Sequence, residues 1–326
     1  MKPAHSATPN VYFHDENPSM GDSRDALLAG LQATQKKVDP KWFYDATGSE
    51  LFEEITRLPE YYPTRTEIAI LQEHAEAISE HCGAQCVLIE PGAGSCEKAR
   101  LLLPHLQPAA YVPLDISAQF LQEAAIALGG EYPWLNVHAV CADFNEDWSF
   151  LDGLPDGKRV IFYPGSTLGN LEPAAALTFL RRVRNIIGEG GGLVVGVDLH
   201  KSSERLTAAY NDASGVTASF NLNVLHRLNE LLDAEFDVDS FSHRAFYNSD
   251  ERRIEMHLVS NSVQSVLCKG IQIDFAEGET IHTENSYKYT VDGFTELARS
   301  AGLTLEKSWL DKDRLFSVHY LSADLT

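Results

Sequence analysis

Polar side chains follow several short apolar runs of this chain, at points where buried strands are expected to end. In an open parallel sheet, small ligands bind beyond the carboxyl ends of the strands. Carboxylate and amide oxygens placed there accept hydrogen atoms from the hydroxyl and amine groups of a ligand. The pattern therefore predicts a small-molecule site at one edge of a parallel sheet. Four residues occupy these positions: Glu90, Asp115, Asp143 and Asn170.

The first of these acids opens a glycine-containing turn, Glu90 to Gly94, with the pattern E-x-G-x-G. Glycine lacks a side chain and lets a ligand lie against the backbone. A third glycine at the spacing of a pyrophosphate-binding turn is missing, so a dehydrogenase is the least favoured hypothesis. An acid beside the turn suits a ligand with a cationic group. S-adenosylmethionine, a nucleoside with a sulfonium and an amino-acid tail, fits this description, and a purely structural strand turn is the alternative.

Two further acids would complete a nucleoside site. Asp115 ends the second predicted strand, where a carboxylate can accept both hydroxyl hydrogens of a ribose. Asp143 would accept from the exocyclic amine of adenine, and the ring of Phe144 would cover the face of the base. Aspartate is also a common helix cap, so Asp143 taken alone leaves both interpretations open.

Charge and cysteine content exclude several classes of partner. The 326 residues include 47 Asp and Glu against 26 Lys and Arg, a formal charge of −21. Nucleic acids and anionic membranes bind basic faces, so we expect neither as a partner. The sequence shows no span-length apolar run and no signal-peptide pattern, which favours the cytoplasm. The cysteines are odd in number and not spaced as zinc ligands, so we expect reduced thiols and no metal site. They are Cys82, Cys86, Cys96, Cys141 and Cys268.

Strands and helices alternate along the middle of the chain. This alternation predicts a parallel α/β sheet with right-handed crossovers, doubly wound by helices on both faces in a Rossmann-like manner. A helix at 292–301 and an antiparallel pair around the turn Asp311–Arg314 would close the sheet, a plan that resembles class I methyltransferases. The predicted parallel strands are residues 86–89, 110–116, 135–142, 159–163 and 191–199.

The pattern changes after Lys201. Two predicted helices are followed by short alternating segments, the clearest at 253–260, which cannot extend a parallel sheet. We therefore expect a second, smaller α+β domain inserted before the last strands. The N-terminus is polar and proline-containing, which predicts a flexible segment. The expected boundaries are 60–200 plus 287–326 for the cofactor-binding domain, 20–59 plus 201–286 for the substrate-binding domain, and 1–19 for the flexible N-terminus.

Residues 41–67 form an aromatic segment that includes the pair Tyr61 and Tyr62. Gly48 is expected to break it, and Ser49 to cap a short helix over 50–57. Two interpretations of so many aromatic side chains stay open. The segment could pack as an arm on the core, or it could form a flap over a ligand pocket.

Several longer motifs together resemble the histidine-specific methyltransferase family of ergothioneine biosynthesis. The resemblance covers the chain from about Trp42 to the C-terminus. It implies transfer of three methyl groups from S-adenosylmethionine to the α-amine of L-histidine, which yields hercynine. The matching stretches are WFYDATGSELFEEITRLPEYYPTR, the E-x-G-x-G turn with Lys98, PLDIS, ADF, PGSTLGN, AYNDASGVTASFNLN, RIEMHL and TENSYKY.

The resemblance also implies two groups of ligand-binding residues. Asn170 and Tyr210 would hold the histidine carboxylate, Asn170 would also hold the amine, and Tyr61 would face the ligand; these three are the expected catalytic residues. Glu284 and Ser286 would contact the two imidazole nitrogens, and Met256 would line the imidazole pocket. The implied cofactor site is Gly92, Lys98, Asp115, Asp143 and Phe144.

The implied reaction is a direct displacement in which the neutral amine attacks the sulfonium methyl. A peptide α-amine has a pKa of about 8 and that of a free amino acid is somewhat higher, so partial deprotonation near neutral pH is feasible and we expect no dedicated strong base. We expect a monomer acting on a small molecule. One alternative is an N-methyltransferase of the same fold that acts on another amino acid, such as a tryptophan derivative. Another is a non-catalytic nucleotide-sensing module.

Overall fold

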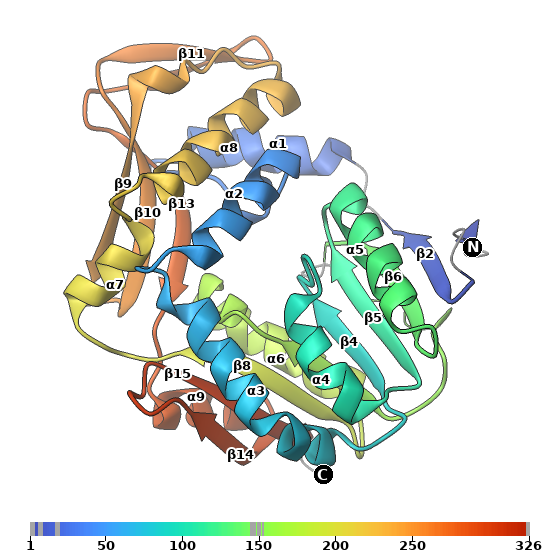
Figure 1. Cartoon of the computed structure of the whole chain (residues 1–326). Coiled ribbons are helices and arrows are strands. Elements are labelled where there is room, and N and C mark those ends of the chain that lie inside the picture. Colours follow the sequence, from blue (N-terminus) through green and yellow to red (C-terminus); the bar gives the residue numbers. More distant parts are fainter. Residues whose placement is uncertain are drawn as a thin grey trace. The chain divides into compact units, whose positions relative to one another are not determined.

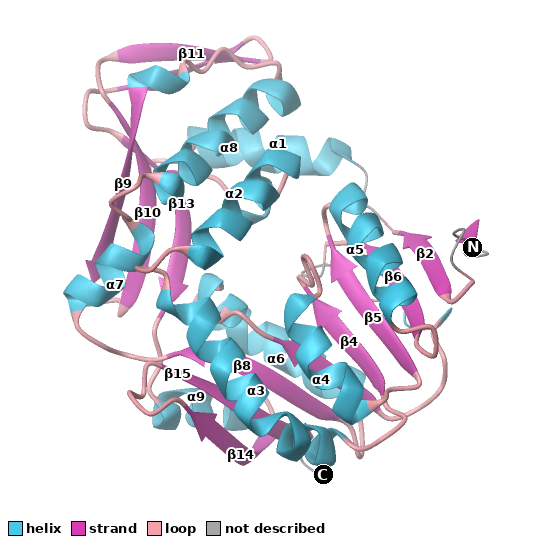
Figure 2. Cartoon of the chain, in the orientation of Figure 1, coloured by secondary structure: helices cyan, strands magenta, loops and turns pink. Residues whose placement is uncertain are grey.

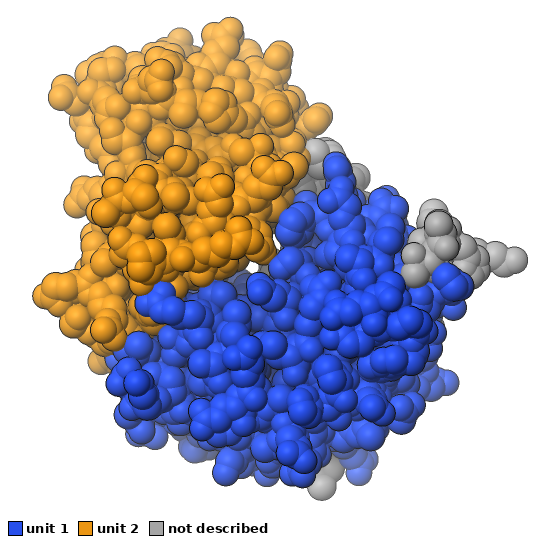
Figure 3. Space-filling model, viewed as in Figure 1, with its two compact units in different colours: residues 1–18, 63–200, 288–326 blue, residues 19–62, 201–287 orange. Residues whose placement is uncertain are grey.

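The computed structural model describes residues 4–5, 9–16, 20–143, 148, 151 and 153–323. The chain forms two compact units, shown in different colours in Figure 3. Unit 1 comprises Met1–Pro18, Pro63–His200 and Lys288–Thr326, and unit 2 comprises Ser19–Tyr62 and Lys201–Tyr287. Each unit is therefore assembled from segments that are distant in the sequence.

Unit 1 is built on one large twisted sheet with the strand order β1-β2-β6-β5-β4-β7-β8-β15-β14 (Figure 1). The strands from β2 to β8 in this order run parallel, and β15 is antiparallel to both β8 and β14. The fold prediction, a doubly wound sheet closed by an antiparallel pair, is confirmed. The strands are β1 (Ala4–His5), β2 (Val11–Asp15), β4 (Val87–Pro91), β5 (Ala110–Asp115), β6 (Asn136–Cys141), β7 (Arg159–Tyr163), β8 (Gly192–Asp198), β14 (Leu303–Leu310) and β15 (Phe316–Ala323).

Helices cover both faces of this sheet. Leu88 of β4 packs in a core with α3, α4 and α5, whereas its neighbours Val87 and Ile89 pack in a second core with α6 and α9. Successive strand residues point to opposite faces, and strands covered on both sides therefore read as continuous apolar runs. These helices are α3 (Tyr62–Cys82), α4 (Glu97–Leu106), α5 (Ala118–Glu131), α6 (Pro173–Ile187) and α9 (Val291–Ser300).

The N-terminal segment corrects one prediction. We expected residues 1–19 to be flexible, yet Val11–Asp15 forms β2 and pairs in parallel with β6. Asn10 anchors the start of this strand, because its side-chain amide contacts the carbonyl oxygens of Gly129, Tyr132 and Leu135 at 3.2, 3.2 and 2.8 Å. Pairing with β6 and the Asn10 contacts hold this strand at the edge of the parallel part of the sheet.

Unit 2 combines a second sheet, in the order β3-β13-β10-β9, with helices and a small hairpin of β11 and β12 (Figure 2). Its strands, apart from β3, pair in antiparallel fashion, as expected for an α+β unit. The elements are α1 (Met20–Gln32), β3 (Lys36–Lys37), η1 (Pro40–Phe43), α2 (Ala46–Arg57), α7 (Ser203–Tyr210), α8 (Val216–Leu232), η4 (Val238–Ser240), β9 (Phe241–Asn248), β10 (Arg253–Ser260), β11 (Gln264–Cys268), β12 (Ile271–Phe275) and β13 (Thr280–Tyr287).

The aromatic segment begins its helix earlier than predicted. Asp45, not Ser49, is the N-cap of α2, and its carboxylate accepts a hydrogen bond from the Gly48 backbone at 2.7 Å. Gly48 therefore lies inside the helix. A Cβ there would lie 1.7 Å from the carbonyl oxygen of Phe43, so the close approach of η1 requires glycine. The ring of Phe43 stacks on Phe220 of α8 at 4.6 Å, which places this part of the segment in the core of unit 2.

The cysteine thiols are buried and free, and all five lie in the described part of the chain. Burial raises the pKa of the Cys86 thiol to about 11 and that of Cys268 to about 11, so both are protonated near neutral pH. Among the described residues, no helix combines the length and apolar character needed to cross a membrane.

Candidate functional site

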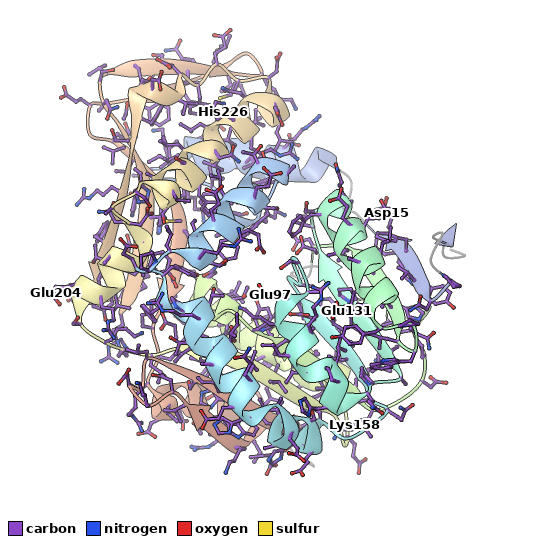
Figure 4. The ribbon with its side chains drawn as sticks, viewed as in Figure 1. Asp15, Glu97, Glu131, Lys158, Glu204 and His226 are labelled. Atoms are coloured by element: carbon purple, nitrogen blue, oxygen red, sulfur yellow. The ribbon has the colours of Figure 1, made fainter. Side chains whose placement is uncertain are left out.

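The glycine turn lies at the carboxyl edge of the unit 1 sheet, between β4 and α4. Gly92 and Gly94 have positive φ values of 70° and 51°, a region that L residues rarely adopt. The Gly94 N–H donates to Oδ2 of Asp115 at 3.0 Å, which ties the turn to the end of β5. Glu97 begins α4 at the same edge and is labelled in Figure 4. The structure therefore joins two predicted cofactor positions, the turn and Asp115.

Asp115 is held by two backbone N–H groups. Besides the contact from Gly94, its Oδ1 accepts from the Ser117 N–H at 3.0 Å. Desolvation raises the pKa of Asp115, and these backbone hydrogen bonds oppose the rise. Each carboxylate oxygen keeps a second lone pair, so the group can still accept the two hydroxyl hydrogens of a ribose.

Glu90 is a buried acid with an unusual proton affinity. Its side chain is 2% exposed and accepts a hydrogen bond from the hydroxyl of Tyr111. Burial raises the pKa of Glu90 to about 8, while Tyr111 and Lys98 pull it down and Glu67 and Asp115 push it up. A cationic ligand nearby would favour the ionised form of this carboxyl.

The remaining cofactor candidates lie on neighbouring elements of unit 1. Asp143 follows β6 and is 6% exposed, and the adjacent Ala142 N–H donates to the carbonyl of Asp115 at 3.1 Å. The ammonium of Lys98, on α4, lies 2.7 Å from Oε2 of Glu67. Phe144 lies outside the described residues. The acids and the lysine thus line one edge of the sheet.

Asn170 is positioned by a compact turn after β7. Gly165 and Ser166 adopt positive φ values of 80° and 57°, and the short helix η3 (Thr167–Asn170) follows. The Asp198 N–H donates to Oγ of Ser166 at 2.9 Å, which fixes the turn to the end of β8. Asn170 therefore stands on an anchored turn at the carboxyl edge of the same sheet as Asp115.

Unit 2 gathers the other residues that the resemblance assigned to histidine. The hydroxyls of Tyr210 and Ser286 are 2.8 Å apart, and the rings of Tyr61 and Tyr210 meet edge to face with centroids 6.0 Å apart. Met256 of β10 pairs directly with Glu284 of β13. Paired residues share a sheet face, as do residues two apart on a strand, so Met256, Glu284 and Ser286 lie on one face.

A β-bulge shapes this face. The register between β10 and β13 shifts between Met256 and His257, which leaves Thr283 as the extra residue. Thr283 donates its hydroxyl hydrogen to Oδ1 of Asn221 at 2.7 Å, and Asn221, from α8, donates to the carbonyl of His257 at 3.1 Å. These bonds satisfy backbone and side-chain groups beside Glu284, so the bulge is a defined local structure.

The opposite face of the same strands holds a polar chain that sequence analysis missed. Arg253 pairs with Glu255 at 2.8 Å, and Glu255 accepts from Nε2 of His257 at 2.9 Å. His257 stacks on His282 at 4.5 Å, and Nε2 of His282 donates to the backbone carbonyl of Glu284 at 3.2 Å. The signal was present in the sequence, because Arg253, Glu255 and His257 alternate with apolar residues along β10.

Three residues of this polar network also lie close enough together to be considered as metal ligands. The ligand atoms of Glu255, His257 and His282 lie within 4.8 Å of one another. These residues already have protein partners: Glu255 contacts Arg253, and His282 contacts the Glu284 carbonyl. We interpret the group as a support for the strand that carries Glu284.

The fold and the glycine turn together define a class of protein. A doubly wound sheet that ends in α9 and the antiparallel strands β14 and β15, with acids around a glycine turn at its carboxyl edge, is the architecture of class I methyltransferases. The chain belongs to the family described as histidine-specific methyltransferase, SAM-dependent, whose model matches residues 23–323.

Individual relatives agree with this assignment. The chain is 44% identical over 292 residues to a histidine N-alpha-methyltransferase of Mycolicibacterium smegmatis, covering 87% of this chain and 90% of the relative. It is 42% identical over 293 residues to a protein of the same name from Mycobacterium tuberculosis, covering 88% and 90%. It is 29% identical over 286 residues to ergothioneine biosynthesis protein 1 of Neurospora crassa, covering 82% of this chain and 31% of that longer protein.

Proposed function

We propose that this protein transfers methyl groups from S-adenosylmethionine to the α-amine of free L-histidine, yielding hercynine for ergothioneine synthesis. Support comes from the family match and from the relatives named histidine N-alpha-methyltransferase. The structural observation that carries the proposal is the buried face of β10 and β13, where an acid and a hydroxyl stand two residues apart beside Met256. Such a face suits a flat ring with two nitrogen atoms.

The unit 1 residues fit the proposed cofactor. Asp115 would accept from the ribose hydroxyls, Asp143 from the adenine amine, and the Lys98 ammonium would bind the carboxylate of the amino-acid tail. Gly92 lets the ligand lie against the backbone, and Phe144 would cover the base. The donor set, two acids and one lysine at the carboxyl edge of one sheet, matches a ligand with both cationic and anionic groups.

The proposed histidine ligands have separate tasks. Glu284 accepts the N–H of the imidazole, Ser286 faces the second nitrogen, and Met256 packs on the ring. Tyr210 and Asn170 bind the carboxylate, and Asn170 also orients the amine. Tyr61, in edge contact with Tyr210, faces the ligand. Because a buried acid without its partner is costly, this arrangement rejects amino acids that lack a ring N–H.

The chemistry requires orientation more than acid or base catalysis. S-adenosylmethionine supplies an electrophilic methyl group, and a neutral amine is a sufficient nucleophile for it. The amine lone pair forms the new bond to carbon, the sulfur keeps the electrons of the old one, and the amine proton passes to solvent. Asn170 and the two tyrosines hold the amine in line with the methyl–sulfur bond. This orientation raises the rate, because the reacting atoms are already aligned when both ligands are bound. A peptide α-amine has a pKa of about 8 and that of free histidine is somewhat higher, so a fraction of the amine is neutral near pH 7 and no dedicated base is needed.

Mass spectrometry of free histidine incubated with the protein and S-adenosylmethionine tests the proposal. We expect histidine with one, two and three added methyl groups, with the trimethylated form accumulating last. Calorimetric binding of S-adenosylmethionine without any methyl transfer would instead indicate a sensing module. Preferential methylation of tryptophan derivatives in a parallel assay would favour the alternative substrate class.

We also propose that the protein works in the cytoplasm as a monomer. The five free, buried cysteines are compatible with a reducing compartment. Light scattering coupled to size-exclusion chromatography tests the monomer, and a mass of two chains at micromolar concentration would contradict it.

A further inference from the structure

Glu67, on the first turns of α3, is a buried acid with no assigned role. Its side chain is 1% exposed. Its carboxylate pairs with the Lys98 ammonium at 2.7 Å and accepts the Gly165 N–H with both oxygens, at 3.0 and 2.9 Å. Three elements of unit 1, α3, α4 and the turn after β7, therefore meet at one carboxylate.

Two glycines make room for this ion pair. A Cβ on Gly196 of β8 would lie 1.9 Å from Oε1 of Glu67, so no larger residue fits there while Glu67 keeps its place. At Gly165 a Cβ would lie 3.2 Å from the Lys98 ammonium, and φ is +80°. The Glu67 carboxylate thus packs against the backbone of Gly196, and the Lys98 ammonium packs against that of Gly165. A buried ion pair is tolerated when hydrogen bonds satisfy its remaining lone pairs, and Gly165 supplies that bond.

Lys98 has a second carboxylate within electrostatic reach. The positive charge of Lys98 lowers the pKa of Glu90, and the negative charge of Glu67 raises it. Lysine is a point charge on a flexible stem, so its direction depends on the partner that holds it. Without Glu67, the ammonium would be free to turn toward Glu90, the acid that begins the glycine turn.

We propose that Glu67 is a positioning residue for both ligands. It holds the Lys98 ammonium in place for the carboxylate of S-adenosylmethionine, and it pins the Gly165 turn that leads to Asn170. The inference rests on the proposed function, because it takes Lys98 as a cofactor contact and Asn170 as a histidine contact. Glu67 itself touches neither ligand and acts through these two groups.

Calorimetric titration of S-adenosylhomocysteine into the whole protein tests the first part. Glu67→Gln keeps the size of the side chain and removes its charge, and we expect the Kd to rise about tenfold, the scale of one charge-assisted hydrogen bond. Lys98→Met should weaken binding by at least as much. The double variant should bind no more weakly than Lys98→Met alone, because Glu67 acts through the lysine. Glu73→Gln, an exposed substitution on the same helix, is the matched control and should leave the Kd unchanged.

Steady-state kinetics test the second part. Glu67→Gln should raise the KM for histidine as well as that for S-adenosylmethionine, whereas mere loss of folded protein would lower kcat and leave both KM values alone. If Glu67→Gln does not fold, Glu67→Asp, which keeps the charge but withdraws it by one methylene, should show the same rise in Kd.

The outcomes separate this inference from the proposed function. An unmodified protein that binds no S-adenosylhomocysteine would overturn the proposed function itself. An unmodified protein that binds normally, with a Glu67→Gln or Glu67→Asp variant that binds equally well, would overturn the role of Glu67. Independent losses that multiply in the double variant would show that Glu67 does not act through Lys98.

Discussion

Replacing Glu284 by alanine should cost histidine turnover more than any other single change on the β10 and β13 face. The side chain is 9% exposed and lies opposite Met256, so little solvent is available to replace it. A bound imidazole would then carry an N–H with no acceptor. The variant also removes a buried negative charge, so the protein itself should remain folded.

The size of the loss follows from the type of hydrogen bond. Bonds to a charged group contribute about 1.5–3 kcal/mol, and about 1.4 kcal/mol corresponds to a factor of ten. We therefore expect kcat/KM for histidine to fall roughly 10- to 150-fold in Glu284→Ala. The Kd for S-adenosylhomocysteine should not change, because the cofactor residues lie on unit 1.

The assay is initial-rate kinetics with histidine varied at saturating S-adenosylmethionine. Glu284→Gln is an intermediate variant, since its amide oxygen still accepts a hydrogen bond but carries no charge. Its kcat/KM should lie between that of the unmodified protein and that of Glu284→Ala. Glu277→Ala, an exposed change in the turn before β13, is the control and should match the unmodified protein. Near-normal turnover by Glu284→Ala would remove Glu284 from the histidine site.

Three further substitutions give separate outcomes. Asp115→Ala removes the acceptor for Gly94 and for the ribose, so the Kd for S-adenosylhomocysteine should rise at least about tenfold by calorimetry, and an unchanged Kd would exclude Asp115 from the cofactor site. Ser286→Ala removes a neutral bond to Tyr210, so kcat/KM for histidine should fall only about 2- to 10-fold, and a larger loss than in Glu284→Ala would reverse our ranking. For Glu90, burial raises the pKa in the folded protein to about 8, above its ordinary value of 4.5, so the folded state keeps a proton that the unfolded chain releases. Stability should therefore fall as pH rises between these values. Glu90→Gln should flatten that fall in urea titrations at pH 5, 6.5 and 8, and parallel curves for both proteins would contradict the assigned pKa.

The parallel sheet could be predicted because its strands are buried on both faces. The strand predicted at 159–163 has the bounds of β7. The same reasoning placed Asp115 and Asn170 at one edge, since strand direction alone brings these positions together.

Other features depend on partners that are distant in the sequence. Strand β2 pairs with β6, and its Val11, Tyr12 and Phe13 are strand-favouring residues inside an otherwise polar, proline-containing segment. Serine often caps helices, so Ser49 was expected to be the cap. The N-cap of α2 is instead Asp45, because Gly48 has no side chain and the helix can begin close to Phe43. Glu67 resembles any acid on an amphipathic helix. Only the approach of Lys98 and Gly165 shows that it is buried.

The order of segments in the chain has a consequence for biosynthesis. Strand β15 lies between β8 and β14, and it pairs with β8 along Gly192–Ser322 and Asp198–Phe316, although the whole of residues 201–287 is translated in between. During synthesis, the backbone N–H and C=O groups of β8 that later pair with β15 therefore stay unpaired while the inserted unit is made. An open edge is a template for strands of other chains. Nascent chains that stall before residue 316 should accordingly be the species that aggregates or recruits chaperones.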